Sequence, residues 1–142
     1  MIKEALIAKI EKATIGSREL DGEIFRAVKS DIIEADWENF NGVWHQCDPE
    51  DAVAWIPPLF YTTKIDDALT LVPEGWFVPS MGERRTPIKF WGDVHEPICH
   101  FAQIQWINGG GRLQHGDAAT IALAITIAAL KARLLQSRLS QN

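Results

Sequence analysis

Apolar residues recur at helical spacing in the N-terminal part of the chain. The segment from Ile2 to Ile15 has lysines and glutamates between its apolar positions, which are Ile2, Leu6, Ile7 and Ile10. This spacing predicts an amphipathic helix. Gly16 interrupts the pattern, and Ser17 is a suitable N-cap for a second helix. The apolar face of that second helix is expected to consist of Leu20, Ile24, Phe25 and Val28.

The pattern is weak between Asp36 and Pro58. Aromatic residues are scattered there among Asn, Gly, Asp and Pro, namely Trp37, Phe40, Trp44 and Trp55. This composition predicts a long loop with a short strand at Val43–Cys47. Structureless stretches of about 20 residues are uncommon inside compact domains. The segment therefore either carries function or contains an element that its periodicity does not reveal.

A short helix is expected next, because Thr63 and Asp66 form a variant of the capping box. Its apolar face is expected to consist of Ile65, Ala68, Leu69 and Val72. Pro73 and Gly75 end the pattern, as they do at many helix C-termini. The sequence thus predicts one compact helix between the loop and the strands that follow.

Strand-forming residues dominate the next region. Trp76–Val78 and Ile88–Trp91 are predicted strands, joined through a turn at Arg84–Thr86. Ile98–Ile107 alternates most clearly, and Arg112–His115 is expected to form a short return strand after a glycine run. One face of the Ile98–Ile107 strand holds Ile98, Ala102, Ile104 and Trp106, and the other holds Cys99, Gln103 and Gln105.

The last helix is the most apolar segment of the chain. Asp117 is its expected N-cap, and it is predicted to run from Ala118 to about Arg138. Its first half is apolar all round, which is typical of a helix covered on every side. Successive strands with short connections imply an antiparallel sheet. The predicted class is α+β: a single three-layer α/β/α-type domain over residues 1–142, with a small antiparallel sheet covered by helices and a helical extension at 1–15.

Charge and length restrict the function classes. The chain has 142 residues, of which 46% are hydrophobic, and its formal net charge is −5. The acidic balance argues against direct binding to nucleic acid or to an anionic membrane. The longest uncharged apolar stretch, Ala118–Leu130, is shorter than the ~20 residues that cross a bilayer. Two cysteines make no disulfide framework, and a cytoplasmic protein is therefore expected.

Three segments of the chain resemble the phage ABA-sandwich domain family, a group of small phage and prophage proteins. They are Ser17–Ile24 (SRELDGEI), Tyr61–Trp76 (YTTKIDDALTLVPEGW) and Ala118–Arg133. Lys64 stands where the family commonly has a serine cap, and Ile121 where a proline is common. The resemblance implies an α/β/α layered fold and a protein of phage or prophage origin in the host cytoplasm. It carries over no catalytic residue.

Metal-binding and catalytic patterns are sparse. His45, Cys47, Cys99 and His100 are of types that zinc prefers. Cys99 and His100 are adjacent, however, and neighbours in a regular strand point to opposite faces. No Ser, Cys or Thr lies in a recognised nucleophile motif, and the glycines at 109–111 do not lead directly into a helix as a phosphate loop does. A non-enzymatic protein without metal or other cofactor is expected.

The six tryptophans are the strongest indication of a binding surface. An indole combines a large apolar area with an N–H donor, which favours interfaces and ligand pockets. Trp76 and Trp91 lie on adjacent predicted strands beside a turn that carries Arg84 and Arg85. An aromatic surface next to two guanidiniums is suited to a small nucleotide-type anion. Alternatively, the two tryptophans pack the sheet against the helices and the arginines are solvated.

The main functional hypothesis is a non-enzymatic phage accessory protein that binds a host or phage protein, including in counter-defence, or a second copy of itself. The first alternative is sequestration of a small anionic nucleotide-type ligand at Trp76, Arg84, Arg85 and Trp91. The second alternative is mimicry of nucleic acid by an acidic face. It requires clustering of Asp31, Glu34, Asp36, Glu38, Asp48, Glu50 and Asp51.

Overall fold

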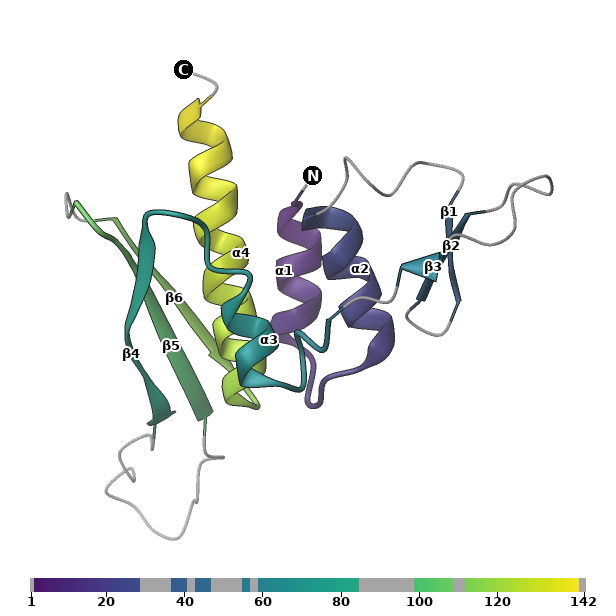
Figure 1. Ribbon diagram of the computed structural model, residues 1–142. Helices are drawn as coiled ribbons and strands as arrows, with labels where there is room; N and C mark the ends of the chain where they lie inside the picture. The colour runs from purple at the N-terminus through teal and green to yellow at the C-terminus, as the bar shows by residue number, and fades with distance from the viewer. Residues whose placement is uncertain are drawn as a thin grey trace, which may run out of the picture.

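The computed structural model of the chain describes residues 2–28, 37–40, 43–46, 55–56, 59–84, 99–108 and 112–140 (Figure 1). For the three short segments between 37 and 56, and for residues 84, 99 and 140, it describes the backbone alone. The helices in these ranges are α1 (Glu4–Glu11), α2 (Arg18–Val28), α3 (Ile65–Leu69) and α4 (Ile121–Ser140).

The main sheet is antiparallel and has the strand order β4-β5-β6. Its strands are β4 (Trp76–Arg84), β5 (Cys99–Trp106) and β6 (Leu113–Ala118). The ladder between β4 and β5 shifts register between Phe77 and Ser80. The predicted strand at Ile98–Ile107 and the return after Arg112 are both confirmed, whereas the predicted strand at Ile88–Trp91 lies outside the described residues.

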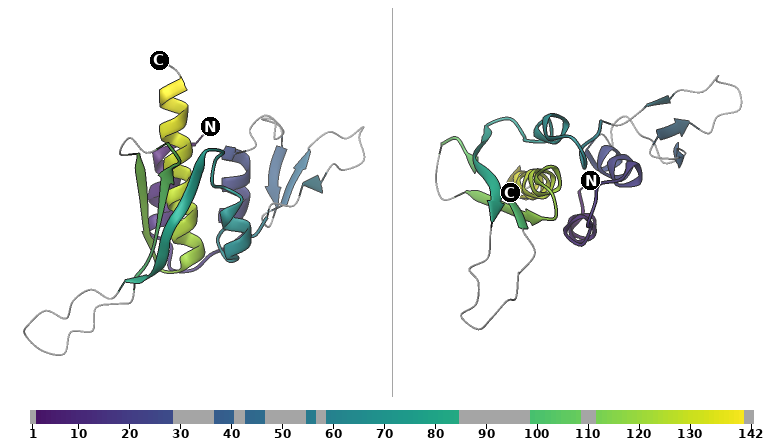
Figure 2. Two further views of the ribbon diagram at one scale, coloured as in Figure 1. Left: turned by 60° about the vertical axis from the view of Figure 1, so that its left-hand side comes forward. Right: turned by 90° about the horizontal axis from the view of Figure 1, so that it is seen from below.

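Helix α4 runs through the middle of the molecule, with the main sheet on one side and the other helices on the other (Figures 1 and 2). Every side chain from 122 to 130 is buried, so the prediction of a covered helix is confirmed. Small residues allow this close packing. Gly116 on β6 faces α4, and a Cβ atom there would overlap the carbonyl oxygen of Ala124 and lie 2.9 Å from the backbone nitrogen of Ala128.

The expected α+β class is confirmed, but the α/β/α order of layers is not. Among the described residues, helices lie against one face of the main sheet, in the order sheet, α4, then α1 to α3 (Figure 2). Ala102 and Ile104 of β5 point toward α4 and are fully buried. The alternate residues, Gln103 and Gln105, lie on the opposite face, and an antiparallel sheet can leave such a face to water.

The helix starts show where local sequence signals succeed and fail. The Ser17 hydroxyl accepts the Leu20 N–H at 3.1 Å, which confirms the predicted cap of α2. The predicted capping box at α3 is wrong, because Lys64 occupies the N-cap position without a side-chain hydrogen bond. Asp117 is also not the cap of α4. It belongs to β6, and the hydroxyl of Thr120 accepts the Leu123 N–H instead.

The prediction of a long loop between Asp36 and Pro58 is wrong in part. This segment contains a second antiparallel sheet made of β1 (Trp37–Phe40), β2 (Val43–Gln46) and β3 (Trp55–Ile56). The small sheet lies beside α2 (Figures 1 and 2). The short strand expected at Val43–Cys47 is present as β2. Within the parts of the chain that the structure describes, no helix is long and apolar enough to cross a membrane.

Candidate functional site

The four residues predicted to bind an anionic ligand are only partly within the described structure. Trp76 is 7% exposed, and its ring meets that of Trp106 edge-on, with 5.7 Å between the centroids. Its buried Nε1 has no hydrogen-bond partner among the described residues. Arg84 ends β4, and its side chain, like all of Arg85 and Trp91, lies outside the described residues. Trp76 therefore occupies a core position.

An aromatic ring does lie beside a guanidinium, but at a different place. The guanidinium carbon of Arg112 is 5.8 Å from the ring centroid of Trp106. The two residues lie side by side because the backbone N–H of Trp106 donates to the Arg112 carbonyl oxygen at 3.0 Å. Gly75, at φ +88°, lies against the Trp106 indole, and a Cβ atom on residue 75 would overlap that ring. Only the pairing of β5 with β6 brings this pair together.

The candidate zinc ligands do not form a site in the described part of the structure. On β5, the Nδ1 atom of His100 lies 3.0 Å from the Ala119 carbonyl oxygen. Its Nε2 atom lies 3.6 Å from a Glu83 carboxylate oxygen. No group of three or more His, Cys, Asp or Glu side chains is placed to hold a metal among the described residues. The side chains of His45, Cys47 and Cys99 lie outside that description.

A buried polar clasp connects two of the segments that carry the family resemblance. The carboxylate of Asp21 is fully buried. Its Oδ1 accepts the Thr62 N–H at 2.9 Å and the Thr62 hydroxyl at 2.7 Å, and its Oδ2 accepts from Arg18 at 2.9 Å. The Ser17 N–H donates back to the Thr62 hydroxyl at 3.0 Å. All these groups are satisfied within the chain, so we interpret the clasp as a structural element.

Tyr61, in the segment before α3, and Arg133, on α4, belong to a second partly buried polar region. Burial raises the pKa of the Tyr61 hydroxyl above its usual value of 10.0. Burial also lowers the pKa of Arg133, whose Nε donates to the Leu71 carbonyl oxygen at 2.6 Å. The Thr126 hydroxyl, inside α4, reaches the Tyr61 carbonyl oxygen at 2.9 Å. These contacts fix α3 and the segment before it against α4.

The first candidate interaction surface is the outer face of the main sheet. Residues that are paired between neighbouring strands lie on the same face, and the register gives three cross-strand rows on this one. The rows are Phe77–Gln105–Leu113, Ser80–Gln103–His115 and Gly82–Phe101–Asp117. Phe77 and Leu113 are 42% and 46% exposed. The Phe101 ring stacks on His115 with 6.2 Å between centroids.

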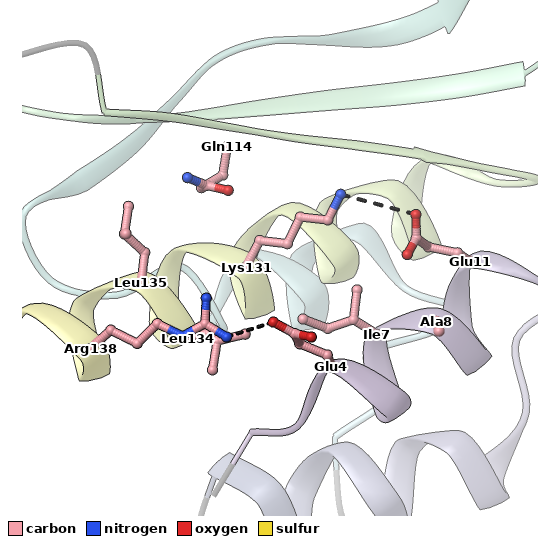
Figure 3. A pocket seen from close by; sticks show the side chains of 9 residues that line it. All are labelled: Glu4, Ile7, Ala8, Glu11, Gln114, Lys131, Leu134, Leu135 and Arg138. Atoms are coloured by element: carbon pink, nitrogen blue, oxygen red, sulfur yellow. Dashed lines mark hydrogen bonds and ion pairs between the residues drawn. The ribbon is translucent and has the colours of Figure 1, made fainter.

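The second candidate surface is a groove between α1, α4 and β6, with a volume of about 500 Å³ (Figure 3). Its floor is apolar and its two rims are charged. The described residues that line it are Glu4, Ile7, Ala8, Glu11, Gln114, Lys131, Leu134, Leu135 and Arg138. Sequence analysis did not identify this groove, although the seven-residue spacing of Glu4 and Glu11, and of Lys131 and Arg138, is visible in the sequence.

Comparisons of the chain with protein-family models, with curated proteins and with solved structures give no match. The resemblance to the phage ABA-sandwich family therefore depends on the three sequence segments alone. A binding function therefore has to be argued from the two described surfaces and their chemistry.

Proposed function

We propose that the protein acts by binding another protein through the outer face of the β4–β5–β6 sheet. The observation that carries this proposal is the exposure of Phe77 and Leu113 on a sheet face that no described helix covers. Large apolar side chains that remain in water on one continuous surface favour an interaction site. Aromatic residues in particular are enriched where proteins meet.

The composition of this face indicates the kind of partner. Its central strand contributes the amides of Gln103 and Gln105, which both donate and accept hydrogen bonds. Apolar side chains flank these amides, and Asp117 is the one carboxylate in the three rows. Such a mixture of apolar and neutral polar groups is typical of interfaces between proteins that also exist apart. The matching partner surface is apolar, low in charge and able to hydrogen-bond.

The biological setting of this proposal follows the sequence resemblance. A small phage or prophage protein of this kind would act without catalysis, in the host cytoplasm, on a host or phage protein. Counter-defence is one such role. Its support is the resemblance of three segments, which is a family-level association and not a property of the sheet face.

Site-specific photo-crosslinking in the natural host cell tests the proposal. A photoreactive residue at Gln103 should form a defined adduct with a partner, whereas one at the exposed Lys12 should not. Replacing Phe77 and Leu113 together with serine should remove the Gln103 adduct. The matched control is Ile15→Ser, which alters an exposed isoleucine far from the sheet face in the sequence. An adduct that survives the double substitution, or no adduct from Gln103 at all, refutes the proposed surface.

A further inference from the structure

The groove between α1 and α4 has charges of opposite sign on its two rims (Figure 3). On α1, Glu4 and Glu11 are seven residues apart, which places them on one side of the helix about 10 Å from each other. On α4, Lys131 and Arg138 have the same spacing. The helices run antiparallel, so Glu4 meets Arg138 at 2.5 Å and Glu11 lies 4.0 Å from Lys131.

The floor between these rims is apolar. Ile7 and Ala8 contribute from α1, and Leu134 and Leu135 from α4. Both leucines are only partly buried, although they lie next to the hydrophobic core. Covering them would remove further apolar surface from water. The groove therefore consists of an apolar strip with an acidic rim on one side and a basic rim on the other, and with no net charge.

We propose that this groove is the interface of a homodimer with two-fold symmetry. A two-fold interface must be complementary to itself. When the symmetry axis runs along the groove, α1 of one copy lies over α4 of the other. Glu4 then meets Arg138 of the second copy, and Glu11 meets Lys131. Each acidic side chain thus faces the same basic residue in the second copy as in its own, while the two apolar strips cover each other.

The present ion pairs leave these charges available for such a contact. Glu4 and Arg138 are 74% and 60% exposed, and ion pairs exposed to this degree contribute little to folding. A stable interface buries about 800 Å² of accessible surface on each partner. This is about a tenth of the 8940 Å² accessible surface of the chain. The contact must therefore extend from the groove along the end of α4, which projects beyond α1 (Figure 1) and carries the exposed Leu139.

A pair of charge-reversal variants tests the dimer. The basic variant carries Glu4→Lys and Glu11→Lys, and the acidic variant carries Lys131→Glu and Arg138→Glu. Light scattering should give twice 15.9 kDa for the wild-type protein. Each variant alone should be a monomer at the same concentration, because like charges would face each other. The equimolar mixture should restore a dimer that contains one copy of each variant.

Control variants separate this interface from a general effect of charge or of unfolding. Lys12→Glu reverses an exposed charge outside the groove lining and should leave the dimer unchanged. Circular dichroism verifies that each variant is folded. Lys131 also donates to the His115 carbonyl oxygen, so if the acidic variant fails to fold, Ala8→Arg becomes the deciding variant. It fills the groove from an exposed position and should give a folded monomer.

The proposal is overturned if the wild-type protein remains a monomer up to about 1 mM. It is also overturned if Ala8→Arg or the charge variants remain dimers, or if the mixture of the two charge variants stays monomeric. These outcomes are independent of the partner proposed for the outer sheet face. The crosslinking experiment at Gln103 can succeed or fail whatever the oligomeric state.

Discussion

The buried carboxylate of Asp21 allows a quantitative prediction, because its hydrogen-bond donors among the described residues are Thr62 and Arg18. Its Oδ1 accepts two bonds from Thr62, one from the backbone N–H and one from the hydroxyl. Its Oδ2 accepts from Arg18. Asp21→Ala removes all three acceptor contacts at once. We expect this substitution to be one of the most destabilising single changes at a polar residue of the chain.

The magnitude follows from what each donor does after the change. The Thr62 hydroxyl can turn to the Ser17 carbonyl oxygen, which is 3.1 Å away, and the partly exposed Arg18 side chain can turn to water. The Thr62 N–H donates to no other acceptor among the described residues, and a buried donor without an acceptor costs about 1–3 kcal/mol. Together with the lost packing, the expected loss is about 2–4 kcal/mol, out of the ~5–15 kcal/mol that typically stabilises a domain.

Urea unfolding, followed by tryptophan fluorescence, measures this loss as a difference in the free energy of unfolding. Asp21→Asn keeps an acceptor for Thr62 and loses the charge that attracts Arg18. The amide N–H2 of Asn would also face the Arg18 donor without an acceptor, so this variant should cost about 1–3 kcal/mol, less than Asp21→Ala. Glu19→Ala, in the same turn but exposed, should remain within about 0.5 kcal/mol of the wild-type value. If Asp21→Ala falls within that same range, the clasp does not hold α2 to the segment at Thr62.

Three further predictions concern packing, ionisation and capping. Gly116→Ala should lower the free energy of unfolding by about 1–3 kcal/mol, because its methyl group meets the backbone of α4. Gly82→Ala should change the free energy of unfolding little, since the added Cβ would lie 3.7 Å from the nearest atom, on the Phe101 ring. Equal losses for Gly116→Ala and Gly82→Ala in urea titrations would contradict this account. Tyr61 is the one tyrosine of the chain, so absorbance reports its ionisation alone. Its midpoint should lie above 10 in the folded protein and near 10 in urea. Because the folded state keeps the Tyr61 proton to higher pH than the unfolded state, the contribution of Tyr61 to stability should be constant below about pH 10 and should fall above it. Equal midpoints in the folded and unfolded protein would show that burial does not raise the pKa of Tyr61. Thr120→Ala should cost about 0.5–2 kcal/mol in the same unfolding assay, and a neutral result would mean that its bond to the Leu123 N–H does not cap α4.

The elements that sequence analysis located are those whose pattern reflects burial directly. The alanine-rich segment at the start of α4 is apolar around its whole circumference, and such a helix is stable in water only when it is covered. In β5, the two-residue alternation placed Ala102 and Ile104 on the buried face, which the structure confirms. Ser17 was located as a cap because its hydroxyl acts on a backbone N–H only three residues away.

Other elements depend on contacts between residues that are distant in the sequence. The strands of the small sheet have two to four residues, too few for a period to appear. Asp117 has the side chain of a helix cap, but the pairing of β6 with β5 continues to Ala118 and keeps Asp117 in the strand. Alternation along β5 shows that the two sheet faces differ, yet it does not tell whether helices cover the second one.

By itself, the sequence determined the α+β class, the antiparallel strands at Ile98–Ile107 and after Arg112, and the central position of the last helix. Each of these follows from local chemistry repeated along a single element. Tertiary structure alone decided the order of layers, the sheet face that no described helix covers, and the groove. Glu4 and Arg138 are 134 positions apart, and only the packing of α1 antiparallel to α4 makes them neighbours. A surface is formed by residues from several elements, and no pattern within one element specifies which others will lie beside it.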